Sequence, residues 1–501
     1  MTAIEQLKQR MADVGTLQSS AAVLEWDQQT HMPPAGAERR SSQLALLSKL
    51  GHEMLTSTET GRLLAEAERG ADALDADSDD AAYLRVARRD FDKAAKLPTK
   101  LVEEIAQVTA LAHEQWAAAR AGNDYKRFAP WLEKILDLER QVTDHLGYKN
   151  ERYDALLDNY EPEMTAAQVR VMFDALKAPV VDLVKAIASR GPDAVNMEPL
   201  RRDFDEEKQR RFNESVIRAF GYDFNRGRQD RAVHPFCTSF TRDDVRITTR
   251  YDRNFLPMAL FGTIHETGHA LYDMGVAAKF DGNVLGGGAS LGIHESQSRF
   301  WENLVGRSRG FWTHFYPALQ AEFPVLGDVD VETFYRAINR VEPSLIRVEA
   351  DEITYNLHIM LRFEMEVDLL DGRLSVSDAP DAWNEKCRQY LGLTPPDDAR
   401  GILQDVHWSF GGIGYFPTYT LGNVISVQLY EAANQSLDGR IPDLIARGEF
   451  LVIREWLGQN VHQWGRKYTP AELVTRCTGR PPTPEPYLRY LKTKFGDIYG
   501  L

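Results

Sequence analysis

Cysteine is scarce in this chain, and what little there is excludes a class of fold. Three cysteines occur in 501 residues, at Cys237, Cys387 and Cys477. They are odd in number, far apart, and form no Cys-x-x-Cys pair. A disulfide scaffold or a cysteine-based zinc ribbon is therefore not expected, and the thiols are expected to be reduced.

Long apolar runs and a positive net charge are also lacking. No stretch approaches the roughly 18 consecutive apolar residues of a membrane span, and the amphipathic start, residues 1–10, has no apolar signal segment. The formal net charge of -15 argues against nucleic acid or an anionic membrane as partner. We therefore expect a cytoplasmic protein that acts on a small or peptidic substrate.

Helical periodicity dominates what is present. Long stretches rich in Ala, Leu, Glu, Lys and Arg cover residues 101–116, 131–146 and 169–187. An acidic stretch at residues 71–80 is expected to be a solvated loop or a helix N-terminus. Length alone suggests two to four domains, but large helical enzymes often fold as one unit. We predict a mostly α fold in one domain, 1–501, with its catalytic core at about 230–425.

One pentapeptide, His265-Glu-Thr-Gly-His269, carries specific chemistry. On a helix, two histidines four residues apart lie on one face and can bind a single zinc ion, with Glu266 beside the metal to handle a proton. Chance alone produces this pattern in roughly 2% of chains of this composition. The surrounding apolar, helix-compatible run favours the metal site over the alternative, a buried helix with two hydrogen-bonded histidines.

A catalytic zinc ion normally has three protein ligands, so a third is needed. The best candidate is Glu295, at the start of another predicted helix, and His294 is left as a partner of a ligand or an alternative ligand. The glycines of the intervening residues 281–290 lack the ending of a phosphate-binding loop. They are expected to form a flexible connection beside the site.

Three further regions attract attention. Residues 234–240 and 245–251 are rich in β-branched and aromatic residues and predict a small hairpin before the zinc helix. Asp244 and Arg246 within it are expected to form a structural ion pair. Clustered glycines at 411–414 beside two tyrosines predict a tight wall around a ligand, although core aromatics with glycine turns explain them equally well.

The third region is polar where its surroundings are apolar. Arg347, Asp351, Tyr355 and His358 are spaced four, four and three apart, which predicts one stripe along a helix. Such a stripe can line a cleft, or it can be an ordinary surface pair between Arg347 and Asp351. The sequence leaves both open.

Taken in order, these segments resemble the motif set of the carboxypeptidase Taq family of metallocarboxypeptidases. Six motifs carry the resemblance: His234-Pro-Phe236, Asp244-x-Arg246-x-Thr248, His265-Glu-Thr-Gly-His269, His294-Glu-Ser-Gln297, Ile346-Arg-x-x-Ala-Asp351 and Gly401-x-x-Gln-Asp-x-His-Trp408. The similarity extends from about Trp26 to the C-terminus.

The resemblance implies a large helical, two-lobed, neurolysin-like fold with a deep central groove and a small sheet near the metal. It further implies a homodimer and one catalytic zinc ion, for which Co²⁺ can substitute. It implies removal of single residues from peptide C-termini with broad preference. By position, His265, His269 and Glu295 would bind the metal and Glu266 would be the catalytic carboxylate.

Chemical requirements suggest further roles. A guanidinium binds both oxygens of a terminal carboxylate, which makes Arg347 the candidate for that contact. The oxyanion needs donors besides the metal, for which Tyr415, Tyr419, His234 and His407 are the candidates. Competing functions are an oligoendopeptidase or dipeptidyl carboxypeptidase with the same zinc site, and a non-catalytic peptide-binding protein with a structural zinc.

Overall fold

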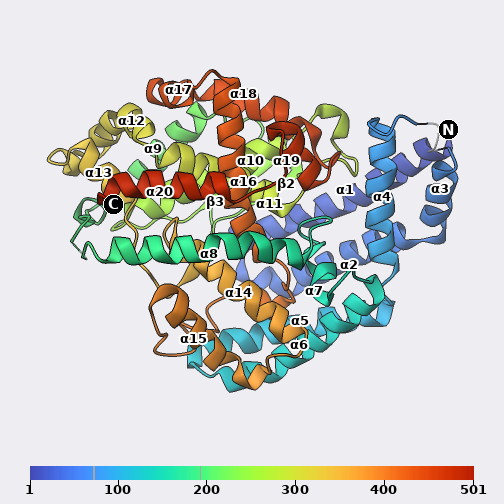
Figure 1. The fold of residues 1–501 in the computed structure, drawn as a ribbon. Coiled ribbons are helices and arrows are strands. Elements are labelled where there is room, and N and C mark those ends of the chain that lie inside the picture. Colours follow the sequence, from blue (N-terminus) through green and yellow to red (C-terminus); the bar gives the residue numbers. More distant parts are fainter. Residues whose placement is uncertain (71–73, 192) are drawn as a thin grey trace. The chain divides into compact units, whose positions relative to one another are not determined.

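The protein is mostly helical, as a computed structural model covering residues 1–70, 74–191 and 193–501 shows (Figure 1). The chain forms two compact units, each assembled from three separate segments. Unit 1 comprises Met1–Ala95, Asn196–Ile338 and Ser426–Pro481; unit 2 comprises Lys96–Val195, Asn339–Ile425 and Pro482–Leu501. No helix in these ranges has the length and apolar character needed to cross a membrane. The prediction of a mostly α fold is confirmed.

Unit 1 contains most of the helices and the small sheet. Its helices are α1 (Ala3–Thr30), α2 (Ala37–Thr56), α3 (Thr58–Glu68), α4 (Asp79–Ala95), α9 (Glu206–Ala219), α10 (Leu256–Gly275), α11 (Leu291–Arg299), α12 (Arg309–Glu322), α13 (Val331–Ile338), α17 (Ile441–Arg447), α18 (Phe450–Asn460) and α19 (Pro470–Thr478). A π-helical segment, Phe300–Gly306, continues directly from α11.

Unit 2 is built from long helices. They are α5 (Thr99–Gly122), α6 (Tyr125–Leu146), α7 (Arg152–Leu157), α8 (Ala166–Ala188), α14 (Thr354–Leu370), α15 (Ala379–Leu391) and α20 (Glu485–Tyr499), and the boundary between the units falls within α16 (Pro417–Ser436). α8 shows why such segments are helical. A capping box formed by Thr165 and Gln168 starts it, and its buried residues, from Val169 to Ile187, recur at helical spacing.

The sheet confirms the predicted hairpin and adds a strand to it. β2 (Cys237–Thr241) pairs antiparallel with β3 (Asp244–Thr249), and β1 (Gln229–Arg231) pairs parallel with the other edge of β3. β1 was not predicted, because three polar residues give no strand pattern. Val245 and Ile247 of the central strand are fully buried in a cluster with Ala270 and Met274 of α10. The sheet therefore supports the helix that carries the paired histidines.

The acidic stretch at residues 71–80 is only partly accounted for, since residues 71–73 lie outside the described residues. Asp79 and Asp80 occupy the first turn of α4, where carboxylates interact favourably with the helix dipole. Asp79 also pairs with Lys467 at 2.9 Å. The prediction of a helix N-terminus is confirmed for this end of the stretch.

Candidate metal centre

His265 and His269 lie one turn apart on α10, as the motif predicts. The helix begins at Leu256, with a proline in its first turn, and nearly every residue from Ala259 to Met274 is buried. The two imidazole rings are 5.0 Å apart between centroids. Because α10 packs on the sheet through Ala270 and Met274, both rings project from a fixed support.

Glu295 comes from α11, which lies unusually close to α10. Ser290 caps the start of α11 by accepting a hydrogen bond from the Ile293 amide at 3.0 Å. Gly268, between the two histidines, faces this helix, and a β-carbon there would lie 2.5 Å from the Ser298 Cα. Only glycine permits this approach, and the approach lets the short Glu295 side chain reach both imidazoles.

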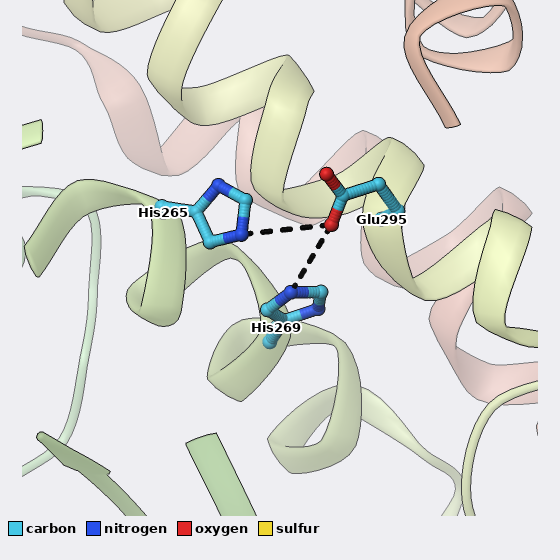
Figure 2. A group of neighbouring side chains, drawn as sticks. All are labelled: His265, His269 and Glu295. Atoms are coloured by element: carbon cyan, nitrogen blue, oxygen red, sulfur yellow. Dashed lines mark ion pairs between the residues drawn. The ribbon is translucent and has the colours of Figure 1, made fainter. Parts of the chain in front are cut away.

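The three side chains converge on one point (Figure 2). Oε2 of Glu295 lies 3.5 Å from Nε2 of His265 and 3.5 Å from Nε2 of His269. Two ligands of a tetrahedral zinc ion, each about 2.1 Å from the metal, stand roughly 3.4 Å apart. The donor set and its spacing therefore fit one zinc ion held by two imidazoles and one carboxylate.

The electrostatics of the site suit a cation. Burial would raise the pKa of Glu295, but the charge of Arg299 and the two histidines outweigh it and hold that pKa well below its usual range. Burial lowers the pKa of His269 to about 4. At His265 burial acts the same way, but the attraction of Glu295 and a hydrogen bond to Glu302 raise its pKa. The negative charge that attracts a proton there would also attract a metal ion.

Glu266 lies beside this cluster in a buried environment. Its side chain is buried, and burial is the main cause that raises its pKa to about 7, against the opposing attraction of His265. A carboxylate with a pKa near neutrality can both accept and return a proton.

His294 and His234 do not join the metal ligands. His294 directs its Nε2 to Asp273, at 3.2 Å, which excludes it as the alternative ligand in this arrangement. His234 lies in the exposed segment between β1 and β2. The predicted ion pair is confirmed: Arg246 bonds Asp244 at 2.7 Å and also stacks on the Trp26 ring, 4.2 Å from its centroid.

The glycine-rich connection at residues 281–290 is packed, contrary to the expectation of a flexible loop. A β-carbon on Gly288 would lie 2.3 Å from the His294 ring, and one on Gly286 would lie 2.9 Å from the Phe280 carbonyl oxygen. These glycines are needed for close approach.

A second cluster, in unit 2, contains the remaining predicted residues. Arg347 donates from Nε and from NH2 to Asp405, at 3.0 and 2.8 Å, and from NH1 to the Tyr355 hydroxyl at 2.8 Å. The Arg347 guanidinium lies 5.1 Å from the centre of the Tyr419 ring. Arg362 pairs with the other Asp405 oxygen at 2.6 Å.

The predicted helical stripe is wrong. Arg347 lies in a short 3₁₀ turn, Arg347–Glu349, and α14 begins only at Thr354. Asp351 accepts hydrogen bonds from the Ile353 and Thr354 amides, at 2.9 and 3.0 Å, so it lies in the turn before the helix and cannot continue a stripe. His358 instead contacts the Ser344 carbonyl oxygen at 3.1 Å.

The two tyrosines beside the clustered glycines lie together with His407 in unit 2, and these contacts fit both a ligand wall and a core of aromatics with glycine turns. Nε2 of His407 lies 3.4 Å from the Tyr419 hydroxyl oxygen. The centroids of the Tyr415 and Tyr419 rings are 5.4 Å apart. Gly414 precedes Tyr415 with a φ of 92°, in contact with the backbone of Leu156 and Leu157. A side chain at that position would be both strained and obstructed.

Comparison with known proteins places the chain. The carboxypeptidase Taq (M32) metallopeptidase model matches residues 6–495. The chain belongs to this family. It is therefore a hydrolase of peptide bonds, of the metallocarboxypeptidase class, and a metal ion belongs to its activity.

Relatives match this M32 chain over nearly its whole length. It is 42% identical to thermostable carboxypeptidase 1 of Thermus thermophilus, covering 99% of both chains, and 38% identical to carboxypeptidase 1 of Bacillus subtilis, covering 96% of both. The crystal structure of the M32 carboxypeptidase from Deinococcus radiodurans superposes with a TM-score of 0.96, at 44% identity and full coverage of both chains.

Several residues around both clusters of this M32 protein escaped prediction. Glu302 contacts His265 and Arg299, and Asp405 joins Arg347 to Arg362. Glu302 lies seven residues beyond Glu295, a spacing visible in the sequence. The pairing of Arg347 with Asp405, 58 positions apart, leaves no local signal.

Proposed function

We propose that the protein is a zinc-dependent carboxypeptidase that releases single amino acids from peptide C-termini with broad preference. The observation that carries this is the convergence of His265, His269 and Glu295, with the buried Glu266 beside them. A structural zinc would need a fourth protein ligand and would leave Glu266 without a purpose.

The metal ion, when bound, would supply Lewis acidity, polarising the scissile carbonyl and promoting loss of a proton from water. Glu266 accepts that proton and returns it to the departing amine. A carboxylate placed beside the metal can carry out both transfers.

Recognition of the substrate's terminal carboxylate is assigned to Arg347. Three of its five N–H donors are used by Asp405 and Tyr355, which fixes the plane of the guanidinium. One N–H on each terminal nitrogen remains beyond these contacts, which is the fork that a carboxylate binds. Burial would lower the pKa of Arg347, but the pairing with Asp405 holds it well above its ordinary value. The guanidinium therefore stays positively charged.

Donors for the oxyanion are proposed among Tyr415, Tyr419, His407 and His234. Tyr415 and Tyr419 each carry a phenol hydroxyl that can donate a hydrogen bond to an oxyanion. Burial lowers the pKa of His407 to about 4, so it acts as a neutral imidazole.

The test combines metal analysis with mass spectrometry of a peptide in its free-acid and C-terminally amidated forms. One equivalent of zinc and stepwise loss of single residues from the acid alone are expected. Release of dipeptides would instead assign a dipeptidyl carboxypeptidase, and internal cleavage of the amide an oligoendopeptidase. Binding of zinc without cleavage of either peptide would leave only the peptide-binding alternative.

We also propose that the two units act as one catalytic domain, in a cytoplasmic homodimer that accepts Co²⁺ in place of Zn²⁺. The resemblance of the six motifs supports these proposals. Light scattering tests the dimer, cell fractionation tests the location, and reconstitution of the metal-free protein tests the cobalt. A single thermal unfolding transition is expected if the units unfold together.

A further inference from the structure

The Nδ1 atoms of His265 and His269, the two proposed imidazole ligands, have different hydrogen-bond partners. Nδ1 of His265 lies 2.9 Å from Oε2 of Glu302, so this carboxylate accepts a hydrogen bond from the imidazole directly. Nδ1 of His269 lies 3.3 Å from Nδ1 of another imidazole, that of His294. A nitrogen-to-nitrogen contact works as a hydrogen bond only if one ring donates and the other accepts.

Asp273 decides which ring donates. Its Oδ1 lies 3.2 Å from Nε2 of His294, and a carboxylate can only accept, so His294 carries its proton on Nε2. In that tautomer, Nδ1 of His294 is an acceptor. His269 must donate from Nδ1, which leaves the lone pair of its Nε2 directed at Glu295 and the ligand point.

The surroundings hold His294 in this orientation. The Tyr272 ring packs on it with centroids 4.7 Å apart, and the Tyr272 hydroxyl accepts a hydrogen bond from the Ala289 amide at 3.0 Å. Gly288 closes the other approach, since a β-carbon there would lie 2.3 Å from Cδ2 of the ring. The packed glycine loop therefore prevents the ring from turning away.

We propose that Asp273 and His294 are positioning residues that fix the tautomer and orientation of His269 for metal binding. This inference rests on the proposed zinc site. The pair orients His269 as Glu302 orients His265, but the contact to the carboxylate runs through the imidazole ring of His294. The acceptor character of residue 273, rather than its charge, is what the arrangement requires.

Zinc affinity tests the proposal without relying on turnover. The dissociation constant of Zn²⁺ is measured by competition with a chelator, for the wild type and for His294→Ala, Asp273→Ala and Asp273→Asn. Loss of the hydrogen-bond partner of a metal-binding imidazole typically weakens metal binding about 10- to 100-fold. We expect such a loss for His294→Ala and Asp273→Ala. Asp273→Asn is expected to stay within about fivefold of wild type, since its amide oxygen can still accept from Nε2.

Controls separate this inference from the proposed function. His52→Ala, a half-buried histidine of α2, is the matched control and should bind zinc as the wild type does. His269→Ala marks complete loss of a ligand. Failure of the wild type to bind zinc would overturn the proposed function, whereas tight binding by wild type, His294→Ala and Asp273→Ala alike would overturn only the positioning pair.

Two further outcomes bear on the proposal. If Asp273→Asn loses as much affinity as Asp273→Ala, the charge matters and the tautomer argument fails. If a variant does not fold, ¹⁵N spectra of histidine-labelled wild-type protein decide instead. They should show His294 protonated on Nε2 and His269 on Nδ1, and the opposite assignment for either ring contradicts the proposal.

Discussion

Gly268 lies so close to Ser298 that a β-carbon on the glycine would stand 2.5 Å from the serine Cα. The contact is between backbone atoms of α10 and α11, so no side chain can rotate to relieve it. One residue to the C-terminal side of Gly268 is His269, and three residues before Ser298 is Glu295. The spacing of α10 and α11 thus depends directly on the absence of a side chain at residue 268.

Gly268→Ala should therefore push α10 and α11 apart and so distort the proposed metal site. Overpacking of this kind costs about 1–3 kcal/mol, and separation of the helices moves Glu295 away from the imidazoles. We expect a lower melting temperature and weaker zinc binding. Gly458→Ala on α18 is the matched control, because its β-carbon would meet nothing within 4 Å; it should be neutral or stabilise by up to about 1 kcal/mol. Equal melting temperatures for Gly268→Ala and wild type would contradict this account.

Glu266→Gln should separate metal binding from catalysis. The amide has nearly the same shape as the carboxylate but cannot accept the water proton, so we expect kcat to fall by at least about 10²-fold. Zinc content should remain one equivalent, because Glu266 is not among the three proposed ligands. Metal analysis and single-turnover rates check both halves. A kcat of Glu266→Gln above a tenth of the wild-type value would contradict the role of Glu266 as proton acceptor.

The sequence predicted α10 and the proximity of His265 to His269 because their signals are local. An apolar helical run, a glycine near its end and two histidines one turn apart all lie within twenty residues. The stripe from Arg347 failed for an equally local reason: Asp351 was counted as a helix residue, although it lies three residues before the first residue of α14, Thr354, and its carboxylate bonds backbone amides there. Contacts such as Arg347 with Asp405, or His269 with His294, depend on how helices pack, and no periodicity encodes them.

Arg347→Lys should weaken substrate binding while leaving the metal in place. A lysine ammonium cannot bond both carboxylate oxygens or keep the bonds to Asp405 and Tyr355 together, so we expect a loss of about 2–3 kcal/mol, or roughly 30- to 150-fold in kcat/KM. Steady-state kinetics on a free-acid peptide measure it, with the loss mainly in KM. The control is Arg373→Lys, an exposed arginine paired with Asp368. If kcat/KM for Arg347→Lys stays within threefold of wild type, another residue binds the carboxylate.

Glu139 on α6 is a buried carboxylic acid whose titration should affect the stability of the protein. Burial raises its pKa to about 7, and only 8% of the residue is exposed. In the unfolded chain its pKa is near the ordinary value of about 4.3. The folded state therefore favours the protonated form. This stabilisation is fully present below the unfolded pKa and is lost as the pH rises through about 7.

Glu139→Gln should flatten this dependence, because an amide stays neutral at every pH. A pKa difference between two and three units corresponds to about 3 kcal/mol of unfolding free energy, so the wild type should lose up to that amount between pH 4.5 and pH 8 relative to the variant. Denaturant unfolding at several pH values measures the difference. Glu133→Gln, at an exposed position of the same helix, should leave the wild-type slope unchanged. If Glu139→Gln and Glu133→Gln give the same slope, Glu139 is not the neutral buried acid that its burial predicts.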